Sequence, residues 1–158
     1  GHLALLATLR PGDPRYGGTP RSGETDASVP LVALAWPVSD PVARYRMASE
    51  RPDERLLAAH RAFWPDEAAM AEGSPVAIVA RGDAQCLPEL FIVQGTADEN
   101  LTPDMQQRLC AAYRARGGVA DVTMYPGQPH AFGGRDPEGT DARDAVDRLV
   151  AFVLRQTP

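Results

Sequence analysis

The second half of the chain alternates short apolar runs with amphipathic segments, and this alternation is the strongest constraint on its fold. Residues 88–98 (PELFIVQGTAD) and 119–127 (VADVTMYPG) are short apolar runs that end in turn residues. Helical patterns follow them over 102–117 and 140–156. Runs of this length indicate strands buried on both faces, and strands that alternate with helices predict right-handed crossovers in a parallel sheet. We therefore predict an α/β fold.

The first half adds a third strand and a helical insertion. Residues 29–36 (VPLVALAW) form another continuous apolar run, which predicts a buried strand. Apolar residues within 3–9 share one helical face, and breakers and polar residues over 11–26 end that helix. Prolines divide 37–75 into short helical pieces, so we expect a helical insertion or cap there.

Helix ends are marked in the second half. Thr102 is the expected N-cap of its helix, with Pro103 at the first helical position and Gly117 at the C-terminal stop. The last helix is expected to be capped by Thr140 or Asp141. Its predicted core-facing side is formed by Ala142, Val146, Leu149, Val150 and Val153.

Composition indicates one globular domain. The chain has 158 residues, 44% of them hydrophobic and 23% charged, and it contains no apolar run long enough to span a membrane. A net charge of -5 argues against a nucleic-acid partner or an anionic membrane surface. Cys86 and Cys110 lack the spacing of a zinc site, and no glycine-rich phosphate loop precedes a helix. We expect no metal and no cofactor, and two cysteines favour a reducing cytoplasm.

Two residues that can act as an acid–base pair follow neighbouring strands. Asp98 ends the run at 88–98, and His130 lies in the loop after the run at 119–127. Ligands of open α/β sheets bind at the carboxyl ends of the strands, where both side chains are expected to emerge. An Asp that accepts a hydrogen bond from one ring nitrogen would leave the other as a general base. The alternatives are that Asp98 caps the following helix and that His130 fills a turn.

Aromatic side chains and the other histidines are further candidates. Trp36 ends its strand on the same rim, and we expect it to contact substrate. The same role is open to three aromatic residues of the insertion, Tyr45, Phe63 and Trp64. We expect His2 to act at a helix start and His60 to pack within the insertion. Glu99 is expected to face solvent or the helix that begins near 102, and the alternative is a spare carboxylate beside Asp98.

Three segments together resemble the C-terminal half of an α/β-hydrolase of the esterase branch, which includes acetyl-esterase-like, feruloyl-esterase-like and prolyl-oligopeptidase-like enzymes. These segments are FIVQGTADENLTP, YPGQPHAF and GHLALLA. The resemblance implies that Asp98, in G-x-x-D, and His130, in P-H-x-F, belong to a Ser, Asp, His triad in that chain order. It also implies that WPVSDPVARYRMA lines the substrate pocket.

The nucleophile of that triad is missing from these residues. The family's typical G-x-S-x-G-G-H-L-A segment matches here only from Gly1 onward, and no G-x-S-x-G occurs in the 158 residues. The resemblance places the serine just before Gly1 and the oxyanion hole in that missing region. The alternative is that Gly1 and His2 are a cloning remnant. We therefore expect 1–158 to be the C-terminal part of a single domain of roughly double this length, with its N-terminal half missing and the first strand leaving an unpaired apolar edge.

The sequence therefore predicts a serine hydrolase that cleaves small-molecule carboxylic esters through an acyl-enzyme, with Asp98 and His130 as its catalytic residues. The fragment alone is expected to be inactive, and the missing N-terminal half is its expected partner. A peptidase or C–C hydrolase on the same fold is an alternative, because fold does not fix substrate. A module that kept the scaffold and lost the nucleophile is another.

Overall fold

The computed structural model describes residues 1–15, 28–51 and 54–155, which form three strands and eight helices in these ranges. Most of the breaker-rich segment predicted over 11–26 lies outside the described residues, as does Gln156. The elements are α1 (His2–Leu9), β1 (Leu31–Ala35), α2 (Pro41–Ser49), α3 (Glu54–Phe63), α4 (Glu67–Glu72), α5 (Pro75–Arg81), β2 (Glu89–Gly95), α6 (Pro103–Ala115), β3 (Ala120–Tyr125), α7 (Phe132–Arg135) and α8 (Thr140–Leu154).

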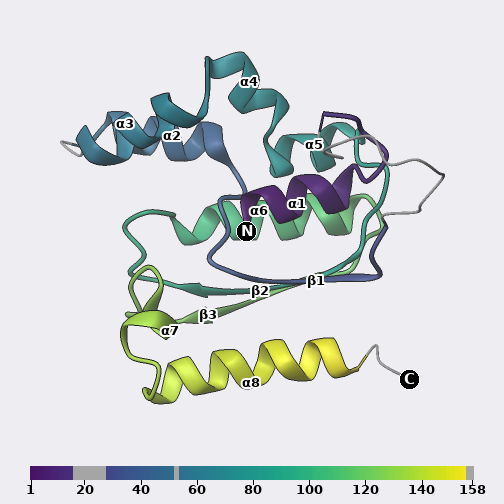
Figure 1. Cartoon of the computed structure of the whole chain (residues 1–158). Coiled ribbons are helices and arrows are strands. Elements are labelled where there is room, and N and C mark those ends of the chain that lie inside the picture. The colour runs from purple at the N-terminus through teal and green to yellow at the C-terminus, as the bar shows by residue number, and fades with distance from the viewer. Residues whose placement is uncertain (16–27, 52–53, 156–158) are drawn as a thin grey trace.

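The three strands form one parallel sheet in the order β1-β2-β3, which confirms the predicted α/β class. The register aligns Leu34 with Ile92 and Ile92 with Val122. Helices α1, α5 and α6 cover one face of the sheet, and α8 covers the other (Figure 1). Within the described residues β1 pairs with β2 alone, so its outer edge is unpaired, as predicted.

Apolar side chains fill both faces of the sheet. The larger cluster lies beneath α1, α5 and α6 and includes Leu5, Leu9, Ile78 and Leu109, all fully buried. The smaller cluster, beneath α8 and around α7, contains Val93, Tyr125, Phe132, Ala142 and Ala145. The continuous apolar runs arise because each strand is covered on both faces.

Prolines begin several helices, and polar side chains cap their first turns. Pro41 and Pro75 stand in the first turns of α2 and α5, where a missing N–H costs nothing. Asp40 accepts a hydrogen bond from the Ala43 N–H at 3.0 Å, and Ser74 caps α5 in the same way. Residues 37–75 thus form the expected short helical pieces, α2 to α4. Helix α5 was not predicted; it lies across α1 and α6 and leads into β2.

Three details of the helices differ from the sequence predictions. Thr102 and Pro103 begin α6 as expected, but the N-cap of α8 is Gly139, not Thr140 or Asp141. Val146, Val150 and Val153 are about half exposed, because α8 turns its Ala142, Ala145 and Phe152 side toward the sheet. There Phe152 stacks on Phe91 with ring centroids 5.4 Å apart, and the alanines allow close approach. In α1, Leu3 is exposed and not part of the buried face.

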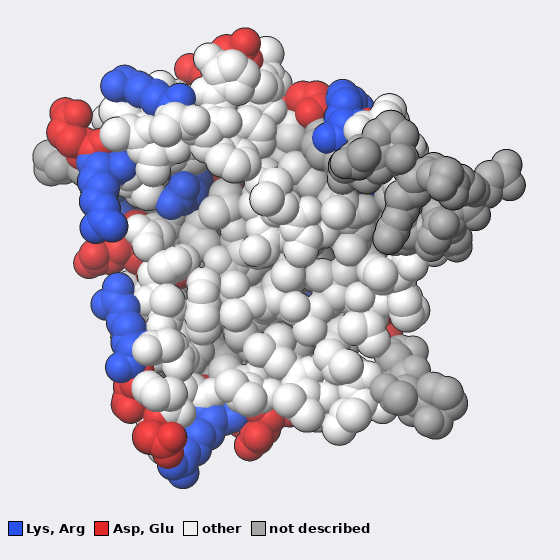
Figure 2. Space-filling view, viewed as in Figure 1, with Lys and Arg blue, Asp and Glu red and all other residues white. Residues whose placement is uncertain are grey.

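Charge is unevenly spread over the surface. In the view of Figure 1, charged side chains gather around the margin of the molecule, and the middle of that face, over α1 and the strands, is largely uncharged (Figure 2). None of the described helices is both long and apolar enough to cross a membrane. The β1 edge of the sheet therefore combines unpaired backbone groups with a largely uncharged surface. A strand edge that is exposed to solvent usually carries charged side chains.

Candidate active site

Backbone contacts join the two loops that follow β2 and β3. The Thr96 N–H donates to the Tyr125 carbonyl at 2.9 Å, and the Ala97 N–H donates to the Gln128 carbonyl at 3.0 Å. A Cβ added at Gly95 would lie 2.2 Å from the Gln128 oxygen, so only glycine permits this approach. The two loops are therefore joined by hydrogen bonds and close packing at the carboxyl ends of the strands.

These joined loops bring Asp98 and His130 together. The His130 Nδ1 and the Asp98 Oδ2 are 2.8 Å apart, within the distance expected for a hydrogen bond. The Asp98 side chain is fully buried, and that of His130 is 27% exposed. Because an ionised carboxylate only accepts hydrogen bonds, Nδ1 is the donor, and in the neutral tautomer with this proton Nε2 holds the lone pair. The pair thus has the tautomer that a general base requires.

Four donors surround the Asp98 carboxylate. Besides His130, Oδ2 accepts a hydrogen bond from the Gln94 amide at 2.8 Å, and Oδ1 accepts from the backbone N–H groups of Asn100 and Leu101 at 2.8 and 2.9 Å. Burial alone would raise the pKa of Asp98, but the hydrogen bonds from His130, Gln94 and Leu101 outweigh it and lower that pKa. Asp98 is therefore ionised at neutral pH.

Two buried glutamines support this arrangement, and sequence reasoning missed both. Gln94 and Gln106 are fully buried. The Gln106 amide donates to the Pro37 carbonyl at 2.7 Å and to the Gln94 oxygen at 3.3 Å, which links α6 to the end of β1. Gln94 could have been found from the sequence, because it lies inside the otherwise apolar run LFIVQG. A buried amide requires hydrogen-bond partners, so a glutamine in such a run indicates a polar contact inside the fold.

Trp36 lies beside His130. Its ring centroid is 6.3 Å from that of His130 and 5.2 Å from that of Phe132. The Trp36 backbone has a φ of 38°, a conformation that bulky residues rarely adopt. Strain of this kind is concentrated at functional sites, where the surrounding structure enforces it. The structure thus places the predicted substrate-contacting residue next to the histidine.

A cavity of about 400 Å³ lies in front of His130, and we call it the reaction cavity. Its wall includes His130, Trp36, and Gly1 at the start of α1. A Cβ at Gly1 would lie 2.7 Å from the Pro37 Cβ, so the start of α1 is packed closely against the chain that follows β1. The N-terminus of a helix therefore opens toward the histidine, and such a terminus favours negative charge.

Of the other predicted side chains, His2 and Phe63 also line the reaction cavity, whereas His60 and Glu99 do not. The His2 Nδ1 donates to the Val38 carbonyl at 2.9 Å, so His2 ties the start of α1 to the segment after β1, in line with its expected structural role. His60 is buried within α3, as expected, and its Nε2 is 3.1 Å from the Arg44 Nη1. Burial and the Arg44 charge lower the pKa of His60 to about 4. Glu99 is exposed, as predicted.

No group of three or more potential metal-ligating side chains occurs among residues 1–15, 28–51 and 54–155. Cys86 and Cys110 are free thiols, and burial raises the pKa of the Cys110 thiol to about 11. A thiol with that pKa stays protonated and is a poor nucleophile.

The fold and the site together define an α/β protein with a histidine–carboxylate pair at the carboxyl ends of parallel strands. No protein-family model matches the sequence, and no curated protein matches it in sequence. Solved structures do match the fold, and esterases are among them.

One match is a thermophilic esterase of the planctomycete Thermogutta terrifontis with propionate bound, which is 17% identical with a TM-score of 0.69 and covers 99% of this chain and 52% of its own. A structure of esterase 2 from the same organism, phosphonylated by sarin, gives a TM-score of 0.74 at 18% identity, with coverages of 99% and 53%. Esterase B of Lactobacillus rhamnosis is 18% identical with a TM-score of 0.68 and coverages of 96% and 48%. The chain thus has the α/β-hydrolase fold of these esterases and spans about half their length.

Proposed function

We propose that this chain supplies the general base and its orienting carboxylate to a serine hydrolase that cleaves carboxylic esters. The observation that carries the proposal is the 2.8 Å hydrogen bond between His130 and a buried, ionised Asp98 at the wall of a cavity. The likeness in fold to esterases supports the proposal, as does the fact that one of them is phosphonylated by sarin.

The proposed reaction uses the His130 Nε2 twice. A serine oxygen attacks the ester carbonyl, and Nε2 takes the serine proton as the tetrahedral intermediate forms. The imidazolium then gives that proton to the leaving alcohol, and the acyl-enzyme remains. Water attacks the acyl-enzyme with Nε2 again as base, and the proton returns to the serine as the carboxylic acid leaves. Asp98 stays ionised and stabilises the imidazolium throughout.

We place the serine in a segment that precedes Gly1. The start of α1 borders the reaction cavity, so a residue directly before it would stand opposite His130. Free N–H groups at the start of a helix would favour the negative oxygen of the tetrahedral intermediate. Without the serine and this oxyanion site, the 158 residues alone are expected to be inactive.

The rest of the domain would pack on the β1 side of the sheet. The unpaired edge of β1 and the largely uncharged face of Figure 2 support this placement. In this proposal residues 1–158 are the C-terminal part of one domain, 37–75 form a cap over the substrate pocket, and Trp36 contacts the substrate. No cofactor is needed, and we retain the cytoplasm as the proposed location because both cysteines are free.

Two alternatives share this geometry. A peptidase or a C–C hydrolase would use the same pair on a different bond. A non-catalytic module would keep the fold and lack the serine. The residues encoded just before Gly1 separate these cases, because a G-x-S-x segment supports the enzyme and its absence supports the module.

The test uses the full polypeptide that contains this chain. We expect hydrolysis of p-nitrophenyl acetate and covalent labelling by a fluorophosphonate, and we expect His130→Ala to abolish both. Glu138→Ala, an exposed change in the loop that follows α7, is the matched control and should retain both activities. Full activity in His130→Ala would exclude the proposed mechanism, and a peptide substrate cleaved in place of the ester would favour the first alternative.

A further inference from the structure

A second cavity, of about 220 Å³, lies between the start of α1 and the end of α3, and we call it the ring subsite. We propose that it binds an aromatic ring of the substrate, so that the enzyme prefers aromatic esters over saturated ones of the same shape. The inference rests on the proposed function, since it assigns the substrate class of the same site.

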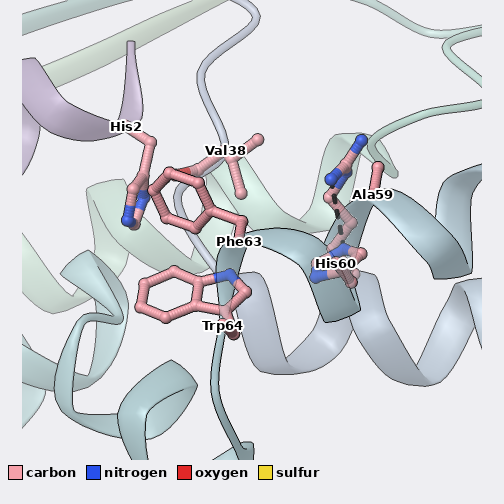
Figure 3. A pocket seen from close by; sticks show the side chains of 7 residues that line it. His2, Val38, Ala59, His60, Phe63 and Trp64 are labelled. Carbon is pink, nitrogen blue, oxygen red and sulfur yellow. Dashed lines mark hydrogen bonds between the residues drawn. The ribbon is translucent and has the colours of Figure 1, made fainter.

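Aromatic rings form much of the wall of the ring subsite. Figure 3 shows the rings of His2, Phe63 and Trp64 grouped on one side of it and His60 on the other. The His2 ring lies edge-on to Trp64 with centroids 5.4 Å apart, and Phe63 lies edge-on to Trp64 at 4.9 Å. An aromatic guest gains edge-to-face contacts from such walls, and a saturated ring does not.

The size and charge of the cavity suit a neutral ring. An apolar cavity of about 150 Å³ is large enough for benzene, so about 220 Å³ admits a substituted ring. Burial lowers the pKa of His2, and burial with the Arg44 charge lowers that of His60 to about 4, so both rings are neutral at pH 7. Arg44 also lines the cavity, held by His60 and by the Asn100 carbonyl at 3.1 Å. A guanidinium in a cavity wall favours the face of a π system.

The ring subsite adjoins the reaction cavity. Four residues line both cavities, namely His2, Val38, Arg44 and Phe63. The two cavities therefore share part of their walls. The Phe63 side chain, at this boundary, is 57% exposed, which is unusual for so large an apolar group. In this proposal an ester whose carbonyl lies at His130 extends its ring past these shared side chains into the subsite.

The experiment compares esters that differ only in the ring, on the full polypeptide. Benzyl acetate is compared with cyclohexylmethyl acetate, and ethyl phenylacetate with ethyl cyclohexylacetate, which tests the alcohol and acyl sides in turn. We expect kcat/KM to favour the aromatic member of at least one pair by about threefold to tenfold. Equal values in both pairs would overturn the ring subsite.

Filling the subsite gives the second test. Ala59 lines the cavity and is exposed on α3, so Ala59→Leu should fold normally and block the cavity. It should lower kcat/KM for the preferred aromatic ester about tenfold and that for its saturated counterpart far less, so that the aromatic preference is lost. Ala58→Leu adds the same side chain at an exposed neighbouring position outside the cavity lining and should change neither value. An unchanged aromatic preference in Ala59→Leu would overturn the assignment.

A binding measurement separates failure of the subsite from failure of the esterase. Benzyl alcohol and cyclohexylmethanol are titrated with detection by saturation-transfer NMR, which requires no turnover. Tighter binding of benzyl alcohol that Ala59→Leu removes supports the subsite even if no ester is hydrolysed. Equal binding of the two alcohols, or benzyl alcohol binding that Ala59→Leu leaves unchanged, overturns it.

Discussion

His130 and His60 show how burial and the charge of a neighbour together set the environment of a histidine. The Nδ1 of His130 donates to the Asp98 carboxylate at 2.8 Å, so this ring faces a negatively charged group. His60 is buried, and its Nε2 accepts from the Arg44 guanidinium at 3.1 Å, so burial first and the Arg44 charge second lower the pKa of His60 to about 4. The same side chain thus lies beside a carboxylate at the ends of the strands and beside a guanidinium in the helical insertion, where it stays neutral at pH 7.

Replacing the carboxylate should have the largest effect. In Asp98→Asn the amide can donate to His130 Nδ1, which would move the ring proton to Nε2 and remove the base. We expect kcat for p-nitrophenyl acetate in the full polypeptide to fall by about a thousandfold to ten-thousandfold, the scale known for this change in serine-protease triads. Asp104→Asn, an exposed change in the first turn of α6, serves as control. A loss below tenfold would mean that Asp98 does not orient the base.

Displacing the loop that carries His130 should have the next largest effect. In Gly95→Ala the new Cβ would lie 2.2 Å from the Gln128 oxygen, so the loop must shift. Misplacement by about 1 Å costs on the order of a hundredfold in rate, and we expect kcat/KM to fall by that amount. Gly134→Ala is the matched control, because its Cβ meets no atom within 4 Å. Equal activity of the two variants would show that the close contact at Gly95 does not matter.

The neutral state of His60 predicts a pH dependence of stability. Its pKa is about 4 in the folded protein and near 6.5 when unfolded, so between these values the unfolded state binds one more proton. This share of stability therefore rises with pH from about 4 to 6.5 and amounts to at most roughly 3 kcal/mol. Urea unfolding across this range should show a flatter dependence in His60→Phe, which keeps a ring beside Tyr45. Parallel curves for the two proteins would contradict the prediction.

Removing the arginine should have the smallest effect. In Arg44→Met the pKa of His60 should rise toward its ordinary value because one of its two causes is gone. Burial is the larger cause and remains, so we expect a rise of only roughly one unit. NMR titration of the His60 ring measures it directly. A lower pKa in the variant would show that Arg44 does not hold His60 neutral.

Much of the sheet could be predicted from the sequence because buried parallel strands produce continuous apolar runs. The runs at 29–36, 88–98 and 119–127 match β1, β2 and β3 with differences only at their ends. Asp98 and His130 could be paired for the same reason, since both follow strands whose carboxyl ends meet at one edge. Their catalytic role remains a prediction.

The remaining features depend on tertiary contacts that no local pattern contains. The side of α8 that faces the sheet is set by the stacking of Phe152 on Phe91, which lie far apart in the sequence. The role of Gln106 follows from its bond to the Pro37 carbonyl across the sheet end. The Arg44 contact that keeps His60 neutral joins two separate helices of the insertion. Periodicity identifies helices, but it does not identify the partners of their polar side chains.

The close contact between Gly95 and the Gln128 carbonyl also determines how this site can change. Because the Asp98 and His130 loops are joined by backbone hydrogen bonds, a motion of either loop carries the other with it. We expect distant packing changes to leave the distance between the Asp98 carboxylate and the His130 ring unchanged. The same changes can alter the distance from His130 to groups on the opposite wall of the reaction cavity. If the chain acts as proposed, substitutions far from the site would alter the rate by moving Asp98 and His130 together, with the hydrogen bond between them intact.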